Sequence, residues 1–147
     1  MLEQMKVMAQ VAIVVKDIEE KSKAYAAFFG VDVPQWRLTA GLEEAHTRYM
    51  GNPTEGQAKL AFIQLDNIQV ELIEPVGGPS TWQNYLDTHG EGIHHIAFRV
   101  PDMEKEIARL EGIGLKLQQT GDYVGGCYAY MDGEAVLGGI VELLASK

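Results

Sequence analysis

The chain has 147 residues, 46% hydrophobic and 22% charged, a composition typical of one globular domain with a core of its own. The formal net charge of −9 argues against nucleic acid or an anionic membrane as the main partner, because both attract clustered Lys and Arg. No apolar run reaches the roughly 18 residues of a membrane span, and no small-residue cleavage site follows Met8–Val15. The one cysteine, Cys127, fits a reducing compartment, so we expect a cytoplasmic protein.

Hydrophobic periodicity and turn signals predict the elements of the first half in chain order. A strand over Met8–Val15 leads to a helix over Ile18–Phe29, which begins after the N-cap residue Asp17 and is ended by Gly30. The later elements are one or two short strands around Trp36–Thr39 and His46–Met50, a loop over Asn52–Gln57, and a hairpin of Leu60–Leu65 and Ile68–Glu74.

The second half begins after the segment Pro75–Pro79, which reads as a linker. Ser80 can cap a short helix that carries Trp82, Tyr85, Leu86 and His89 on one face. The predicted elements that follow are a strand over Ile93–Val100, a helix over Met103–Glu111, and strands near Leu115–Gln119, Cys127–Met131 and Leu137–Leu144.

An internal repeat relates the two halves. The segment Q-V-A-I-V-V-K-D-I-E from Gln10 aligns with H-I-A-F-R-V-P-D-M-E from His95 at a spacing of 85 residues (95 − 10). The motif V-E-L-I around Glu71 returns as V-E-L-L around Glu142 at a spacing of 71 (142 − 71). The repeat predicts an α+β fold of tandem βαβββ modules with pseudo-twofold symmetry. We expect one domain over residues 1–147, with module one at about 6–75, a linker and short helix at about 76–90, and module two at about 91–147.

Two adjacent histidines open the apolar run I-H-H-I-A-F-R-V. Strand alternation places His95 and Arg99 on one face, where they would line a cavity. It places His94 with Ile96 and Phe98 on the opposite, core-facing side. His95 is therefore the candidate ligand or catalytic residue, Arg99 the candidate for binding an anionic substrate, and His94 a structural histidine.

Two glutamates lie inside apolar strands, where a bare carboxylate is costly to bury without a partner, a metal ion or water. They are Glu71 and Glu142, which are equivalent in the repeat, as are Gln10 and His95. If the halves pack about a pseudo-twofold axis, these four side chains converge. One imidazole, one amide oxygen and two carboxylates would suit a divalent Mn, Co, Ni, Zn, Fe or Mg ion.

Four motifs over nearly the whole chain resemble the vicinal oxygen chelate superfamily, which includes glyoxalase I, bleomycin-resistance proteins and extradiol dioxygenases. The methylmalonyl-CoA epimerase branch is the most similar. The motifs are V-K-D-I-E-E at Val15–Glu20, V-E-L-I-E-P at Val70–Pro75, H-G-E-G-I-H-H-I-A-F at His89–Phe98 and V-E-L-L at Val141–Leu144. The resemblance implies a curved mixed sheet around a cleft, and a homodimer.

The resemblance also implies metal ligands at Gln10, Glu71, His95 and Glu142. The chain departs from the family pattern at position 10, where family enzymes usually have histidine. A second departure lies in Ala58–Leu65, since epimerases of this type carry a carboxylate base on the matching strand and A-K-L-A-F-I-Q-L has no acid.

The leading hypothesis is a metal-dependent isomerase, epimerase or lyase that acts on a small carbonyl compound or thioester through an enolate-type intermediate. It would resemble methylmalonyl-CoA epimerase or glyoxalase I, with Glu142 as general base. One alternative is a metal-free protein that binds an apolar or aromatic ligand in the cleft, as a resistance protein does. An extradiol dioxygenase is less well matched, because Gln10 replaces a histidine of its two-histidine, one-carboxylate iron site.

Overall fold

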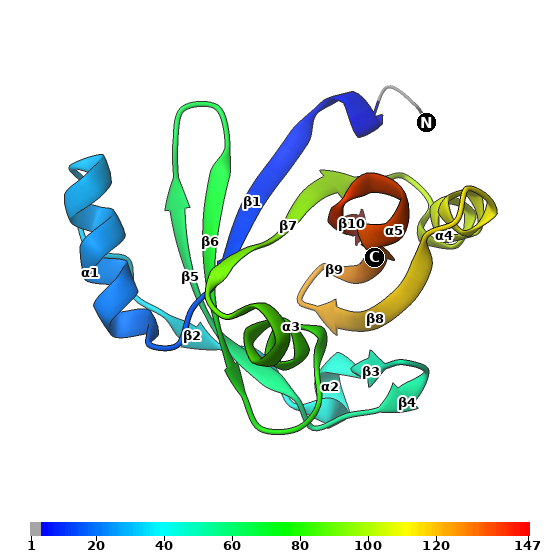
Figure 1. Ribbon diagram of the computed structural model, residues 1–147, viewed down its shortest axis with the longest axis horizontal. Coiled ribbons are helices and arrows are strands. Elements are labelled where there is room, and N and C mark those ends of the chain that lie inside the picture. The colour runs from blue at the N-terminus through cyan, green and yellow to red at the C-terminus, as the bar shows by residue number, and fades with distance from the viewer. Residues whose placement is uncertain (1–3) are drawn as a thin grey trace.

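A curled ten-stranded mixed sheet organises the part of the chain that the computed structural model describes, residues 4–147 (Figure 1). The strands are β1 (Met8–Val14), β2 (Arg37–Leu38), β3 (Arg48–Tyr49), β4 (Asn52–Pro53), β5 (Gln57–Gln64), β6 (Gln69–Val76), β7 (Gly92–Arg99), β8 (Lys116–Tyr123), β9 (Gly126–Gly133) and β10 (Gly139–Ser146). The helices are a 3-10 turn (Gln4–Lys6), α1 (Ile18–Phe29), α2 (Leu42–Ala45), α3 (Thr81–His89), α4 (Met103–Gly112) and α5 (Glu134–Leu137).

The strand order β2-β5-β6-β1-β7-β10-β9-β8-β3-β4 shows the duplication directly. The first strands of the two halves, β1 and β7, pair antiparallel at the centre of the sheet. Each has a parallel partner on its outer side, β6 for β1 and β10 for β7. The predicted fold of tandem βαβββ modules in a curved mixed sheet is therefore confirmed.

Helix α1 begins and ends at the predicted residues, and α4 begins at the predicted Met103 and ends one residue after the predicted Glu111. The Asp17 side chain accepts hydrogen bonds from two backbone N–H groups of the first turn of α1, and Gly30 ends the helix at φ 71°. The left-handed conformation favours glycine because it has no Cβ. Asp102 caps α4 in the same way through the backbone N–H of Lys105. The predicted helix over Ile18–Phe29 is confirmed at both ends.

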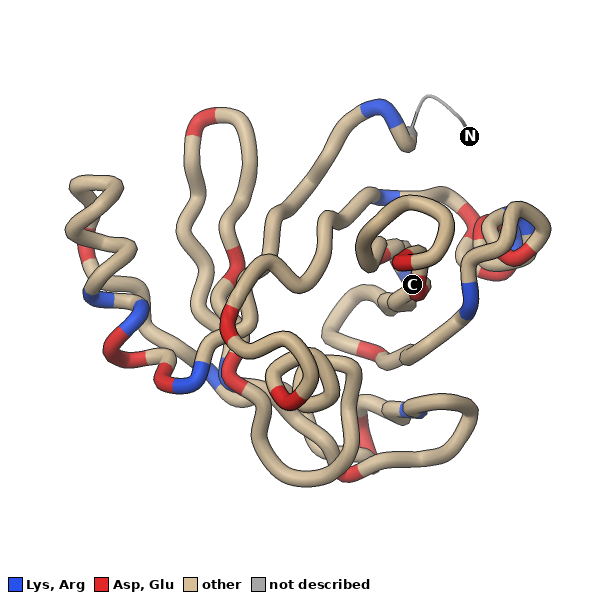
Figure 2. Tube along the Cα trace, viewed as in Figure 1, with Lys and Arg blue, Asp and Glu red and all other residues tan. Residues whose placement is uncertain are grey.

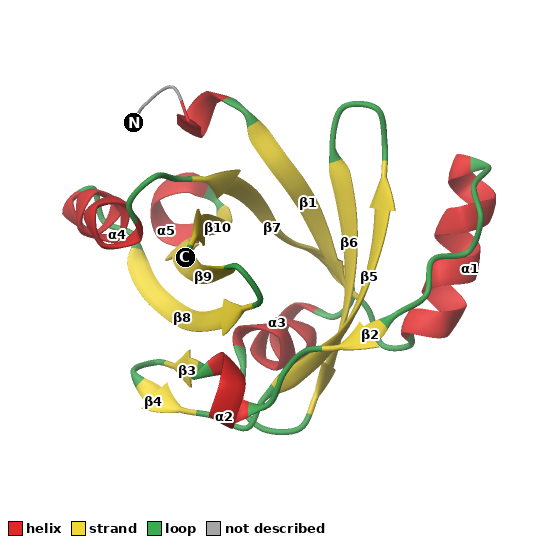
Figure 3. Ribbon diagram, turned by 180° about the vertical axis from the view of Figure 1, so that it is seen from behind, coloured by secondary structure: helices red, strands yellow, loops and turns green. Residues whose placement is uncertain are grey.

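The helices divide between the two faces of the sheet (Figure 3). On the outer face, α1 covers Ile63, Val70 and Leu72, and α4 lies over a cluster that includes Met131 and Leu143. On the inner, concave face, Trp82 of α3 packs into a third cluster. That cluster also contains Ala12, Val14, Ala58, Ile73, Tyr130 and Ile140. Helix α3 thus lies between the two halves.

Three local features differ from the predicted elements. The predicted loop over Asn52–Gln57 contains the two-residue strand β4, and the short helix α2 precedes β3. Strands β3 and β4 come from the first half but join the edge of the second, where Arg48 pairs with Thr120. Leu137 ends the helix α5 rather than beginning a strand, because Gly138 adopts φ 82° and β10 starts only after it.

Acidic and basic positions are interspersed along the outer helices α1 and α4 (Figure 2). Within residues 4–147, none of the helices is long and apolar enough to cross a bilayer.

Candidate functional site

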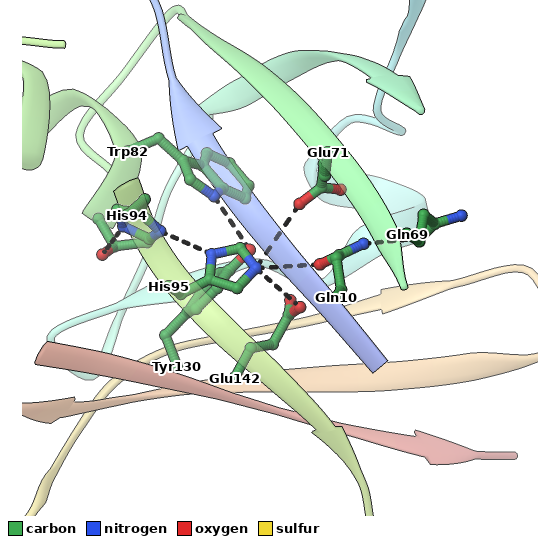
Figure 4. Close-up of polar contacts among 9 residues, drawn as sticks. Gln10, Gln69, Glu71, Trp82, His94, His95, Tyr130 and Glu142 are labelled. Atoms are coloured by element: carbon green, nitrogen blue, oxygen red, sulfur yellow. Dashed lines mark hydrogen bonds and ion pairs between the residues drawn. The ribbon is translucent and has the colours of Figure 1, made fainter. Parts of the chain in front are cut away.

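Four buried polar side chains from the neighbouring strands β6, β1, β7 and β10 meet on the inner face (Figure 4). His95 Nε2 lies 3.0 Å from Gln10 Oε1 and 3.1 Å from Glu142 Oε1. Its distance to Glu71 Oε1 is 3.6 Å. The exposed fractions of these four residues lie between 1% and 6%. The residues singled out by the repeat, hereafter the four-residue cluster, therefore lie together.

Strand alternation explains why the two glutamates face inward. Val141 and Leu143 on either side of Glu142 pack into the cluster beneath α4, which leaves the Glu142 side chain on the inner face. Val70 and Leu72 flank Glu71 in the same way beneath α1.

His94 also points to the inner face, and its predicted core-facing position is wrong. The pairing of β1 with β7 shifts register at this point, since Ala12 pairs with His95 and the next residue of β1 pairs with Ile93. His94 is the extra residue of this bulge, and a bulge breaks the strict alternation of side chains. Its ring packs edge-on against Tyr130, with centroids 5.2 Å apart.

Hydrogen bonds from outside the four-residue cluster hold Gln10 and His95. The Gln10 Nε2 atom donates to Gln69 Oε1 over 2.8 Å, which directs the amide oxygen of Gln10 toward His95. His95 Nδ1 lies 2.8 Å from His94 Nδ1, and His94 Nε2 lies 3.0 Å from the Thr81 hydroxyl. These hydrogen bonds to residues outside the cluster thus fix the orientation of both side chains.

The Gln10 amide fits the site in two orientations, which differ by exchange of its oxygen and nitrogen. In the first, Oε1 faces the oxygens of Glu71 and Glu142, so several lone pairs converge and a cation is required to balance them. In the second, Nε2 donates to Glu142 Oε1 at 3.2 Å and to Glu71 Oε1 at 3.3 Å. The second orientation sets the Gln10 oxygen 2.8 Å from Gln69 Oε1, so the Gln69 amide must turn as well.

The electrostatics of the four-residue cluster favour positive charge. Burial raises the pKa of Glu71 well above its usual value, and the nearby Glu142 charge raises it further, while Arg37 opposes both effects. Burial also raises the pKa of Tyr130, with Glu142 and Glu71 adding to the shift. The ionised form of Glu71 is therefore costly here until a cation joins it.

The donor set fits a divalent cation. Cis ligands of an octahedral ion with bonds of about 2.1 Å lie about 3 Å apart, which matches the 3.0 and 3.1 Å separations from His95 Nε2 to Gln10 and Glu142. Within residues 4–147, histidine, cysteine, aspartate and glutamate side chains alone form no group of three spaced to hold a metal ion. Glu71, at 3.6 Å, has the longest separation from His95 Nε2. Coordination would thus need the Gln10 oxygen or a small inward shift of Glu71.

Arg99 lies outside the four-residue cluster and lines an open cavity of about 500 Å³ next to it. The cavity is also lined by Val7, Met8, Ala9, Gln64, Asn67, Ile68 and Gln69. Gln69 belongs both to this cavity and to the hydrogen bond that orients Gln10. The cavity therefore adjoins the site on the side of Gln10.

Sequence reasoning assigned no role to several residues around the site. Strand alternation places Gln69 on the same face as Glu71, but no sequence pattern pointed to its hydrogen bond with Gln10. Arg37 has no such signal, although its guanidinium lies 5.7 Å from the Phe62 ring centroid and its charge acts on Glu71. Thr81 lies on a helix that the repeat does not contain, so only the structure brings its hydroxyl to His94.

Several proteins with similar sequences or structures are methylmalonyl-CoA epimerases. An ethylmalonyl-CoA/methylmalonyl-CoA epimerase of Cereibacter sphaeroides is 33% identical over 76% of this chain and 74% of that protein. The mitochondrial methylmalonyl-CoA epimerase of Dictyostelium discoideum is 29% identical over 68% of this chain, and the match spans about half, 52%, of that protein. A crystal structure of methylmalonyl-CoA epimerase from Mycobacterium tuberculosis superposes with a TM-score of 0.63 at 19% identity, covering 96% of this chain and 88% of that one.

Residues 9–130 match the family model of the Glyoxalase/Bleomycin resistance protein/Dioxygenase superfamily. This match covers most of the chain, including Gln10, Glu71 and His95, and ends before Glu142. The fold, the duplicated halves and the matched residues agree, and the chain belongs to the glyoxalase/bleomycin resistance protein/dioxygenase superfamily.

Proposed function

We propose that this chain is a metal-dependent enzyme that moves a proton at the carbon next to the carbonyl group of a small carbonyl compound or thioester. The reaction would be an epimerisation, as named for two relatives, or an isomerisation. The observation that carries the proposal is the convergence of the carboxyl groups of Glu71 and Glu142 on His95 in a buried site.

The four residues that would hold the cation are Gln10, Glu71, His95 and Glu142. A bound divalent ion, with Zn, Ni, Co, Mn and Fe as the candidates, would supply electrostatic stabilisation of the negative charge that develops on the substrate's carbonyl oxygen. The two carboxylates balance the ion's charge, and the neutral amide of Gln10 makes the site weaker than one with histidine at this position.

Glu142 is our candidate for the general base. Strand β5 has the sequence Q-A-K-L-A-F-I-Q, so no carboxylate on it can act in this way. Glu142 would accept the proton as the C–H bond breaks, and the electron pair would pass to the carbonyl oxygen. Return of this proton from Glu142 to a neighbouring atom would complete an isomerisation. An epimerisation would instead be completed by a proton that water delivers to the opposite face of the carbon, after which Glu142 would lose its own proton to solvent.

Arg99 is our candidate for recognising the substrate outside the reacting centre. It lines the cavity of about 500 Å³ beside Gln69, so a substrate that reaches the four-residue cluster from this side passes the guanidinium. A guanidinium pairs well with a carboxylate or phosphate group. A thioester with an anionic portion would satisfy both Arg99 and the apolar side chain of Met8.

The test combines metal analysis with proton exchange. Protein purified without chelator should contain a stoichiometric metal ion and should exchange the α-proton of methylmalonyl-CoA in heavy water. His95→Ala should abolish both, whereas His89→Ala, which changes an exposed histidine on α3, should abolish neither. Bound metal without exchange would remove the thioester epimerase and leave another carbonyl substrate.

A second candidate function is a metal-free binding protein. The second orientation of the Gln10 amide carries it, because Nε2 then satisfies Glu71 and Glu142 without any cation. Metal-free protein that binds an apolar ligand with unchanged affinity after His95→Ala would support this candidate and contradict the enzyme.

A further inference from the structure

A chain of buried hydrogen bonds reaches His95 from the side away from the other cluster residues. The Thr81 hydroxyl donates to Gln118 Oε1 over 2.7 Å. Thr81 Oγ1 is 3.0 Å from His94 Nε2, and His94 Nδ1 is 2.8 Å from His95 Nδ1. The exposed fractions of Thr81, His94 and His95 are 0%, 2% and 1%, so water does not compete for these bonds.

The number of protons available in this series of hydrogen bonds determines which group donates in each bond. A hydroxyl has one proton, and Thr81 gives it to Gln118, so Thr81 Oγ1 must accept from His94 and the ring proton of His94 lies on Nε2. His94 is neutral, because its hydrogen-bond partners in the described chain are a hydroxyl and another imidazole and it has no carboxylate partner. Its Nδ1 therefore carries a lone pair and accepts a hydrogen bond from the N–H group at His95 Nδ1.

We propose that Thr81 and His94 are positioning residues that keep a proton on His95 Nδ1, which leaves Nε2 as the nitrogen that binds a cation. His95 Nε2 is the atom that faces Gln10 Oε1, Glu71 and Glu142. Three acceptor oxygens around Nε2 would by themselves favour an N–H at that nitrogen. The hydrogen bonds from Thr81 through His94 oppose that preference. Such outer partners of a ligating histidine set its tautomer and its basicity.

The bulge in β7 makes this arrangement possible. Adjacent residues of a regular strand point to opposite faces, so two neighbouring histidines would not share a hydrogen bond. The extra residue at position 94 turns its ring to the inner face, beside His95 and within reach of α3. Gln69 likewise orients Gln10, the residue equivalent to His95 in the repeat, by accepting a hydrogen bond from its amide nitrogen.

The inference rests on the proposed metal site for its purpose, but its first test needs no metal. The side-chain ¹⁵N shifts of His95, measured in metal-free protein at alkaline pH where both rings are neutral, report which nitrogen carries the proton. We expect the Nδ1–H form in the native chain. In Thr81→Val, His94 loses its acceptor, its proton moves to Nδ1, and His95 should change to the Nε2–H form. A native His95 in the Nε2–H form would overturn the proposal.

The second test is the affinity for Co²⁺, followed by calorimetry or by the visible spectrum. Loss of an outer partner costs about 10- to 100-fold in metal affinity, and we expect a loss of this size in Thr81→Val. Thr81→Ser keeps the hydroxyl and should restore both the tautomer and the affinity. Thr88→Val makes the same change on the same helix, at a hydroxyl that bonds Asn84 O, and should alter neither.

A second variant tests the same proposal if Thr81→Val fails to fold. Gln118→Leu leaves position 81 intact but frees the Thr81 hydroxyl to donate to His94, so it should shift the His95 tautomer in the same direction. If the tautomer shifts while the native chain binds no Co²⁺, the positioning inference stands and the metal-dependent function fails. If the native chain binds Co²⁺ and neither variant changes the tautomer, the positioning inference fails and the proposed function stands.

Discussion

Replacing Glu71 by glutamine should stabilise the metal-free protein and should reduce the stabilisation that a metal ion adds. Burial and the Glu142 charge raise the pKa of Glu71 in the folded chain. A carboxyl group whose pKa is higher in the folded state than in the unfolded state destabilises the fold. This cost grows as pH rises from the unfolded-state pKa to the folded-state pKa and stays constant above it. Glutamine has the same shape and no charge, so Glu71→Gln should raise the unfolding midpoint of metal-free protein near neutral pH.

With metal present, a second effect of the substitution opposes the first. A cation at about 100 times its Kd adds about 2.7 kcal/mol to the free energy of unfolding, and a tenfold weaker site adds about 1.4 kcal/mol at the same concentration. The difference of about 1.3 kcal/mol corresponds to a midpoint about 3 to 5 °C lower for a chain of this size. Glu71→Gln should therefore reduce the metal-induced rise in midpoint by at least that amount.

The assay is thermal unfolding by circular dichroism, in chelator and in a series of Zn²⁺ and Co²⁺ concentrations. Glu104→Gln makes the same substitution at an exposed position on α4 and should leave both midpoints within experimental error of the native chain. A lower midpoint of Glu71→Gln in chelator would refute the charge argument. An unchanged metal-induced rise would refute the assignment of Glu71 as a ligand.

Three further predictions address the site, the substrate and the fold. Gln10→His should raise the affinity for Co²⁺ and Ni²⁺, since an imidazole replaces a weaker amide donor, and calorimetry showing equal or lower affinity would contradict the proposed ligand set. Arg99→Ala should raise KM for an anionic thioester more than it lowers kcat, and an effect on kcat alone would place Arg99 in the chemistry instead of in binding. Asp17→Ala should lower the free energy of unfolding by about 0.5 to 2 kcal/mol through loss of the α1 cap, measured by urea titration, and a loss below this range would mean that the cap bonds are not needed.

The internal repeat made most of the fold and the site predictable. It aligned Gln10 with His95 and Glu71 with Glu142, and strand alternation then put both glutamates on the face opposite the apolar core. Residues that are equivalent in the repeat lie at the same level along their strands. Hydrogen bonding between neighbouring strands therefore brings them close together in the sheet.

The features that were not predictable depend on partners far along the chain. The bulge at His94 arises from a register shift against β1, which no local pattern of β7 encodes. The crossing of β3 to β8 joins residues about 70 positions apart, and two-residue strands have no periodicity of their own. The acceptor of the Thr81 hydroxyl, Gln118, lies 37 positions further along the chain.

The ends of the sheet limit how two copies of this chain could associate. Both outermost strands, β2 and β4, are only two residues long, and β4 contains Pro53, which has no N–H to offer. Short terminal strands and proline discourage a second polypeptide from adding to a sheet by backbone pairing. The homodimer that we predict should therefore assemble through contacts between side chains on the faces or loops of the molecule, and not by extension of the ten strands into twenty. Sedimentation equilibrium would test for the dimer itself, with a monomer as the contradicting result.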